Sequence, residues 1–247
     1  MSQYGYSSRF GSPGGISIGP SGPVPPGVKS LIAVNTAVYV AQVLAPAERL
    51  IALFGLIPAK VAHFELWRLF TYQFLHGGVW HLALNMLMLW MFGSELEQRW
   101  GRRFFLRYYM LCAVGGGITY TLVSWGTWTP SVGASGAIYG VLMGYGLWFP
   151  NRMVLLAFLF PVRVRHVVLF LIFVELLQAI EATGTGIAYA AHLGGMLFGF
   201  AYLRWWTRGG LGLGPVPGWN DVRRAYRRWR FRRLQRKRFP GNGPTLH

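Results

Sequence analysis

Residues 133–149, with the sequence GASGAIYGVLMGYGLWF, decide the class of fold. The stretch carries no charged residue and ends just before Pro150 and Arg152, which is the composition of a membrane helix. A second stretch of this kind, AHLGGMLFGFAYL at 191–203, has His192 as its second residue. Polar or ionisable side chains are costly inside a bilayer, so Ser135 and His192 are candidate functional residues.

The whole chain has the composition of a membrane protein. It has 247 residues, of which 53% are hydrophobic and 13% are charged, and its mean hydropathy is +0.35. We predict an all-α, polytopic bundle with six transmembrane helices at Leu31–Ala45, Leu82–Leu96, Phe104–Trp125, Ser135–Phe149, Val167–Ala182 and Ala188–Trp206. The apolar run Val154–Phe160 ends at Pro161 and is too short to span, so we expect it at the membrane interface.

The net charge of +17 is distributed unevenly among the loops. Arginines occur in the connections after the second and fourth apolar stretches, whereas 126–133 and 183–187 contain no Lys or Arg. The positive-inside rule therefore predicts that both termini and the basic loops are cytoplasmic. This divides the chain into a disordered cytoplasmic arm at 1–30, a six-span domain at 31–206 and a basic cytoplasmic tail at 207–247.

The basic tail has two interpretations. Its segment 223–239, RRAYRRWRFRRLQRKRF, interleaves arginines with Tyr226, Trp229 and Phe231, which could contact phosphates and stack on bases. A polybasic segment next to a membrane span is instead typical of binding to anionic lipid, and we favour this partner over nucleic acid.

The chain shows no cleavable signal peptide, and 1–30 lack the character of a mitochondrial transit peptide. We therefore expect a bacterial inner membrane. Cys112 is the single cysteine, so an internal disulfide is excluded.

Ser135 and His192 are expected at the same depth in the membrane. Ser135 precedes the end of its stretch by about 22 Å of helix, and His192 precedes the basic and aromatic end at Arg204 by about 20 Å. With a hydrocarbon core about 30 Å thick, Ser135 would lie about 8 Å below the outer interface. The two residues would then face each other within a recess.

Glycines are spaced so that these two helices can approach closely. They recur as Gly136, Gly140 and Gly144 in one stretch, and as Gly195 and Gly199 in the other. Small residues at this spacing allow membrane helices to pack backbone against backbone. The pattern is consistent with ordinary packing and also with packing that brings Ser135 to His192.

The chemistry of this pair points to nucleophilic catalysis. A serine hydroxyl needs an adjacent base, and a neutral imidazole can take its proton. Ser135 begins a helix, where free backbone amides could stabilise an oxyanion. Tyr139, one turn later, either stacks on the His192 ring or is a plain packing aromatic.

His81 and Asn85 form a second polar pair, one turn apart on the same helix face. They could donate hydrogen bonds to a developing oxyanion, bind a metal, or connect helices as structural polar residues. Metal is disfavoured because the chain has no HExxH motif and no cysteine cluster, so we expect neither metal nor cofactor.

These motifs resemble those of the rhomboid intramembrane serine proteases. The resemblance covers about 31–206 and rests on GASG at 133–136 with Tyr139 and Gly140, AHLGG at 191–195 and HGGVWHLALN at 76–85. LWRLFTYQFLH at 66–76 and GSELEQRWG at 93–101 resemble the family's first loop and the end of its second span.

The resemblance assigns roles to individual residues. It implies a six-helix rhomboid bundle with Ser135 and His192 as a catalytic dyad that has no third carboxylate. It further implies oxyanion stabilisation by His81 and Asn85, and a supporting role for Gly133, Gly136 and Tyr139. Finally, it implies a structural contact between Arg68 and Glu97.

We therefore expect a serine endopeptidase that cuts membrane proteins in or near their transmembrane segments through an acyl-enzyme. The resemblance implies substrates with helix-weakening residues and small side chains at the cut, entering between the second and fifth spans. A non-catalytic rhomboid-like protein that binds membrane clients, and a transporter, are the alternatives. An aspartyl protease is excluded because Asp221 is the single aspartate.

Glu175 is a further ionisable residue in an apolar stretch, that of the fifth predicted span. Helix arithmetic places it near mid-membrane, about 12 Å from the inner end. We expect it to be protonated or hydrogen-bonded to a neighbour rather than ionised, with a role in gating or water relay as the functional hypothesis.

Overall fold

The structure is a computed structural model that describes residues 20, 22–156, 160–181 and 188–207. Residues 1–19 and 21 of the predicted N-terminal arm, nearly all of the basic tail and two short connections lie outside these residues. The disorder expected for the arm is wrong for 26–30, which form the first turns of a helix, and stays a prediction for 1–19 and 21. The lipid binding expected for the tail also stays a prediction.

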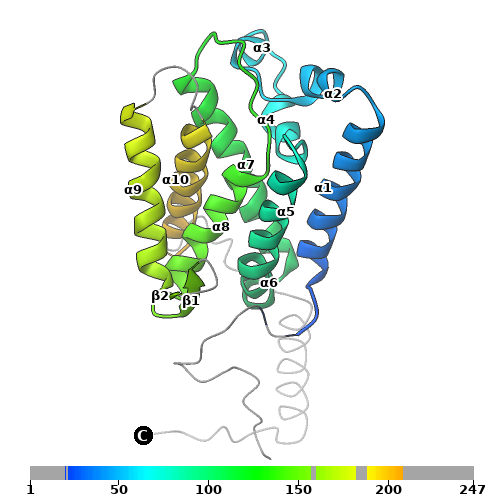
Figure 1. Cartoon of the computed structure of the whole chain (residues 1–247). Coiled ribbons are helices and arrows are strands. Elements are labelled where there is room, and N and C mark those ends of the chain that lie inside the picture. Colours follow the sequence, from blue (N-terminus) through cyan, green and yellow to red (C-terminus); the bar gives the residue numbers. More distant parts are fainter. Residues whose placement is uncertain (1–19, 21, 157–159, 182–187, 208–247) are drawn as a thin grey trace, which may run out of the picture.

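The described chain is a bundle of helices (Figure 1). The long ones are α1 (Pro26–Leu44), α7 (Arg102–Val123), α8 (Ser135–Trp148), α9 (Val164–Glu181) and α10 (Ala188–Thr207). A further long rod is formed by α5 (Val79–Met88), the π-helical turn η2 (Leu89–Gly93) and α6 (Ser94–Trp100). The short elements between the first two rods are α2 (Ala47–Phe54), α3 (Pro58–Ala62), α4 (Arg68–Thr71) and the 3₁₀ turn η1 (Tyr72–Phe74).

These rods coincide with the six predicted apolar stretches, but three of them start three or more residues early. The second rod begins at Val79 rather than at Leu82. α1 begins at Pro26, five residues before the predicted start, because Pro26 suits the first turn of a helix and Glu97 accepts hydrogen bonds from the next two amides. α9 begins at Val164, three residues early, because the chain enters it directly from a strand.

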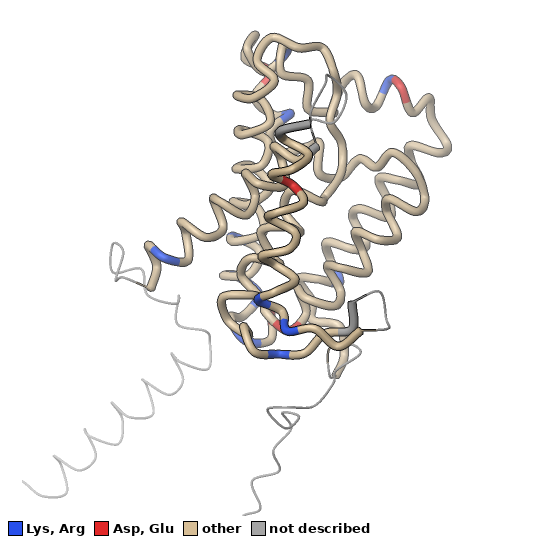
Figure 2. Tube along the Cα trace, turned by 60° about the vertical axis from the view of Figure 1, so that its left-hand side comes forward, with Lys and Arg blue, Asp and Glu red and all other residues tan. Residues whose placement is uncertain are grey.

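The bundle has two distinct ends (Figure 1). The short helices α2, α3 and α4 gather at one end, where α5 also begins, and we call this the site end. At the opposite end lie α6 and a two-stranded hairpin. Lys and Arg concentrate there, whereas the middle of the bundle is nearly free of charge (Figure 2), and we call it the basic end.

The described residues are mostly helical, as expected, and they also contain one small hairpin. β1 (Met153–Leu156) pairs antiparallel with β2 (Phe160–Arg163), with Met153 opposite Arg163. Each strand has four residues, and Pro161 cannot donate a helical hydrogen bond. The described ends of the apolar run 154–160 therefore belong to paired strands, and its expected position at the membrane interface stays a prediction.

The close approach of α8 and α10 depends on glycine, as the sequence predicts. A Cβ atom on Gly195 would lie 1.9 Å from the carbonyl oxygen of Gly136, and one on Gly140 would lie 2.9 Å from the carbonyl oxygen of Gly195. These distances leave no room for a side chain. The prediction of backbone-to-backbone packing at these glycines is confirmed.

Large apolar side chains are exposed on the outward faces of the helices. They include Val40, Leu84, Leu122, Leu169, Phe173 and Leu197. Among the described residues, Pro26–Leu44 is the one helix that is both long and apolar enough to cross a membrane on those two criteria alone.

Candidate active site

Ser135 is the first residue of α8, and the loop before it depends on a glycine. Gly133 has φ +125°, a conformation that other residues rarely adopt, and a Cβ there would lie 2.7 Å from Cε1 of His81. The Gly133 amide donates a 3.1 Å hydrogen bond to the carbonyl oxygen of Tyr72. Gly133 therefore lets the loop pass against His81 and start α8 at Ser135.

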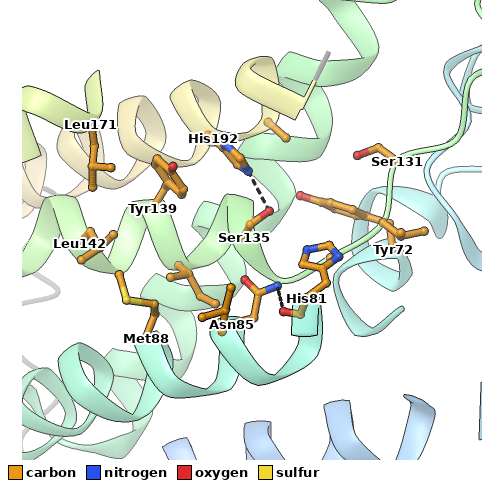
Figure 3. Close-up of a pocket in the computed structure, with 15 residues that line it drawn as sticks. Tyr72, His81, Asn85, Met88, Ser131, Ser135, Tyr139, Leu142, Leu171 and His192 are labelled. Atoms are coloured by element: carbon orange, nitrogen blue, oxygen red, sulfur yellow. Dashed lines mark hydrogen bonds between the residues drawn. The ribbon is translucent and has the colours of Figure 1, made fainter. Parts of the chain in front are cut away.

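His192 lies near the start of α10 and reaches the serine across the glycine crossing. Its Nε2 is 2.8 Å from Oγ of Ser135 (Figure 3). The two residues are 57 positions apart in the sequence, and the contact is part-buried. This geometry allows proton transfer between the hydroxyl and the ring.

The Tyr139 ring packs flat against the ring of His192. Its ring is stacked on the His192 ring, with centroids 4.1 Å apart and planes 3° from parallel. This confirms the interpretation in which Tyr139 stacks on His192. The stack restricts rotation of the imidazole and so holds Nε2 toward the serine.

His81 and Asn85 lie on α5 and face the same cavity (Figure 3). The Gly77 amide donates to Nδ1 of His81 over 3.3 Å, so in the neutral ring the proton is on Nε2, which is free to donate into the cavity. Asn85 donates one N–H to the His81 carbonyl oxygen at 2.9 Å and keeps a second N–H for another acceptor. Both side chains can thus donate a hydrogen bond to a ligand beside Ser135.

The cavity has a volume of about 330 Å³ and brings all these residues together. Its walls come from α5, α8, α10, η1 and the loop before Ser135, and Leu171 of α9 lines its side. Tyr72 and Ser131 also line it, although the sequence offered no signal for them. In the part of the chain that is described, no three His, Cys, Asp or Glu side chains are grouped to hold a metal ion.

His76 supports the His81 ring from the loop before α5. The two rings meet edge to face with centroids 5.2 Å apart. Burial, followed by the effect of His81, lowers the pKa of His76 to about 4, so this ring is neutral at neutral pH. A neutral neighbour leaves His81 free to act as a donor without a fixed positive charge beside it.

The contact between Arg68 and Glu97 that the resemblance implies is wrong. Arg68 donates to the carbonyl oxygens of Gly55 and Ala52, both at 2.7 Å, and pairs with Glu65. Glu97 lies near the end of the α5–α6 rod, about 27 Å of helix beyond the start of α5. Each residue fixes a different end of the bundle, so they cannot meet.

Glu175 is the site residue whose place the sequence analysis missed. Its Oε1 lies 2.9 Å from Nδ1 of His192, so the expectation that it is hydrogen-bonded to a neighbour is confirmed. The resemblance implies no third carboxylate, so this contact is a finding of the structure. The placement of Glu175 near mid-membrane stays a prediction.

Comparisons with known proteins agree on one family. The family model described as "Rhomboid domain" matches residues 63–208, more than half of the chain. "Rhomboid protein 1, mitochondrial" of Saccharomyces cerevisiae is 32% identical over 217 residues, which are 84% of this chain and 56% of that protein. "Rhomboid protease GluP" of Bacillus subtilis is 34% identical over 155 residues, which are 62% of this chain and 28% of that protein.

"Rhomboid-like protease 3" of Toxoplasma gondii is 38% identical over 100 residues, which are 40% of this chain and 37% of that protein. The chain therefore spans about half or less of the length of these relatives. Their names include mitochondrial and bacterial proteins, so they do not support the expectation of a bacterial inner membrane. On the match to the rhomboid domain, this chain belongs to the rhomboid family of integral membrane proteins.

Proposed function

We propose that the chain is a serine endopeptidase that hydrolyses peptide bonds in or near the transmembrane segments of other membrane proteins. Ser135 is the nucleophile and His192 the general base. The observation that carries the proposal is the 2.8 Å contact between His192 Nε2 and Ser135 Oγ, at the wall of a cavity that can admit a peptide. The protease names of relatives from Bacillus and Toxoplasma support it.

The reaction follows from the atoms on the cavity wall. Oγ of Ser135 gives its proton to Nε2 of His192 and bonds to the carbonyl carbon of the substrate. The negative charge that develops on the carbonyl oxygen is stabilised by His81 Nε2–H, by the free N–H of Asn85 and by the first amides of α8, which have no partner within the helix. His192 then returns the proton to the leaving amine as the C–N bond breaks, and water hydrolyses the acyl-enzyme.

We further propose that the six rods cross the membrane, with the basic end on the cytoplasmic side and the site opening to the opposite side. Exposed apolar side chains along the rods and the concentration of Lys and Arg at the basic end support this orientation (Figure 2). A substrate helix would enter between α5 and α9. It must unwind, because helical carbonyl groups are already hydrogen-bonded, and so substrates with helix-weakening residues and small side chains at the cut are favoured.

For the segment 223–239 we propose binding to anionic lipid. The argument is its charge alone, since these residues lie outside the described part of the chain. A chain lacking 220–247 should bind vesicles that contain anionic lipid more weakly than the full chain does. Equal binding would contradict the proposal.

A fluorophosphonate probe tests the central proposal, because it labels only a serine activated by a neighbouring base. The purified full chain in detergent should be labelled and should cleave a membrane-spanning reporter substrate. Ser135→Ala and His192→Ala should lose both signals and keep the wild-type unfolding temperature. A folded wild-type chain without labelling would contradict the protease and favour a non-catalytic binding protein or a transporter.

A further inference from the structure

Glu175 presents a carboxylate to the catalytic histidine from a third helix. Its side chain is 4% exposed, and its Oε1 lies 2.9 Å from Nδ1 of His192. Its other oxygen, Oε2, is buried and makes no hydrogen bond within the described residues. The Tyr139 hydroxyl interacts with the same carboxylate. A buried carboxylate is costly for folding, and both of these partners belong to the site, so a structural role alone explains its presence poorly.

The contacts form one continuous chain of hydrogen bonds. Glu175 Oε1 meets Nδ1 on one side of the imidazole ring, and Ser135 Oγ meets Nε2 on the other at 2.8 Å. A neutral imidazole has one donor nitrogen and one acceptor nitrogen. An ionised carboxylate can only accept, so it holds the proton on Nδ1 and leaves the lone pair of Nε2 directed at the serine. That tautomer is the one a general base requires.

We propose that Glu175 is the positioning residue of the site, the third member of a Ser135–His192–Glu175 triad. The inference rests on the proposed function and goes beyond the two-residue dyad that the family resemblance implies. Glu175 selects the tautomer of His192 and stabilises its charged form, and it touches neither substrate nor Ser135.

The role of Glu175 in the reaction follows from the positions of the two protons on the His192 ring. When Oγ of Ser135 attacks, its proton moves to Nε2 while the other ring proton stays on Nδ1, and the imidazolium then faces the Glu175 carboxylate. The titratable groups around the ring are Tyr139 on α8, stacked on its face, and His81 on α5, across the cavity. Neither is an anion at neutral pH, so the carboxylate is the group here that stabilises the imidazolium.

Kinetics of Glu175→Gln test the role. The variant keeps the size of the side chain and loses its charge, so kcat should fall by about 10²–10⁴-fold with little change in KM. Glu175→Asp should recover part of kcat. Gln178→Leu, one turn further along α9 at an exposed position, is the matched control and should keep kcat.

The outcomes separate this inference from the proposed function. If the wild-type chain shows no cleavage that depends on Ser135, the proposed function fails. If the wild type cleaves and Glu175→Gln keeps its kcat, the positioning role of Glu175 is wrong.

A measurement that needs no activity covers the case of a variant that does not fold. ¹⁵N NMR of the wild-type chain, with the His192 signals identified by their loss in His192→Asn, should show the proton on Nδ1. A proton on Nε2 would mean that a neutral Glu175 donates to the ring, and this would overturn the inference.

Discussion

Two buried carboxylates lie at different levels of the bundle, and their partners differ in kind. Glu97, at the basic end, accepts hydrogen bonds from the amides of Gly27 and Val28 at 2.7 and 2.6 Å. Glu175, inside α9 and nearer the site, meets one nitrogen of His192 and also interacts with the Tyr139 hydroxyl.

The difference lies in whether the partner can exchange a proton. Backbone amides cannot lose theirs, so Glu97 stabilises the N-terminus of α1 and holds it to α6. A histidine gains and loses protons near neutral pH, so a carboxylate beside it can influence a reaction. Glu95, also at the basic end, is likewise held by groups that only donate to it, the Arg152 guanidinium and the Tyr145 hydroxyl.

The largest loss of stability is expected at the crossing of α8 and α10, because both ends of the bundle depend on this contact. Gly195→Val places atoms where the Gly136 carbonyl oxygen already lies, and no rotamer relieves that clash. The free energy of unfolding should fall by more than about 3 kcal/mol, and activity should be lost with the fold. Thermal unfolding in detergent measures it. Leu197→Val, on the exposed side of α10, should change little, and a stable Gly195→Val would contradict the crossing.

A change confined to the site should abolish function and spare the fold. His81→Ala removes one oxyanion donor, which typically lowers kcat by about 10²–10³-fold. Reporter cleavage per folded molecule measures the loss, and the unfolding temperature should stay near that of the wild type. His63→Ala, at an exposed histidine in the loop after α3, serves as the control. Equal kcat in the two variants would assign His81 a structural role.

The opposite pattern is expected at the basic end. Glu97→Gln replaces two charge-assisted hydrogen bonds to the start of α1, so the free energy of unfolding should fall by about 1.5–3 kcal/mol. Activity per folded molecule should be unchanged. Glu48→Gln, at an exposed glutamate of α2, is the control. A variant with normal stability and reduced kcat would show that the two carboxylates are not divided between fold and chemistry.

The smallest effect is expected at the stack on His192. Tyr139→Leu removes an aromatic contact of about 0.5–1.5 kcal/mol, so kcat should fall by no more than about tenfold. Tyr139→Phe keeps the ring and should retain most of the activity. If Phe were as damaging as Leu, the hydroxyl rather than the stack would be the important group.

Much of this molecule could be predicted from local pattern. Apolar runs of helical length located the six rods, because burial or lipid exposure along a whole helix leaves a continuous signal in the sequence. The strands Met153–Leu156 and Phe160–Arg163 were missed, because a run of a few apolar residues does not by itself distinguish helix from strand. The starts of α1 and α9 were late for a similar reason, since helix ends depend on partners such as Glu97 that lie far away in the sequence.

The residues of the site could be predicted from the sequence, but their contacts could not. Ser135, His192, His81 and Asn85 could be singled out because a polar residue in an apolar helix is conspicuous. The Arg68–Glu97 contact was wrong because each residue has better partners nearby, the Gly55 and Ala52 carbonyls for one and the start of α1 for the other. Which polar groups pair is a property of three-dimensional distance, and motif order does not encode it.

The sequence by itself determined the class of this protein, its apolar rods, its glycine-dependent crossing and the candidate residues, because each of these is a matter of composition and spacing along one helix. Only the tertiary structure decided that Tyr139 stacks on His192, that Glu97 holds α1 and that Glu175 meets Nδ1. Those contacts join different helices, and their existence depends on the rotation and level of each helix to within a few ångströms. A hydrogen bond is lost over a shorter distance than that, so the geometry of the packed bundle had to be known before the carboxylate could be connected to the serine.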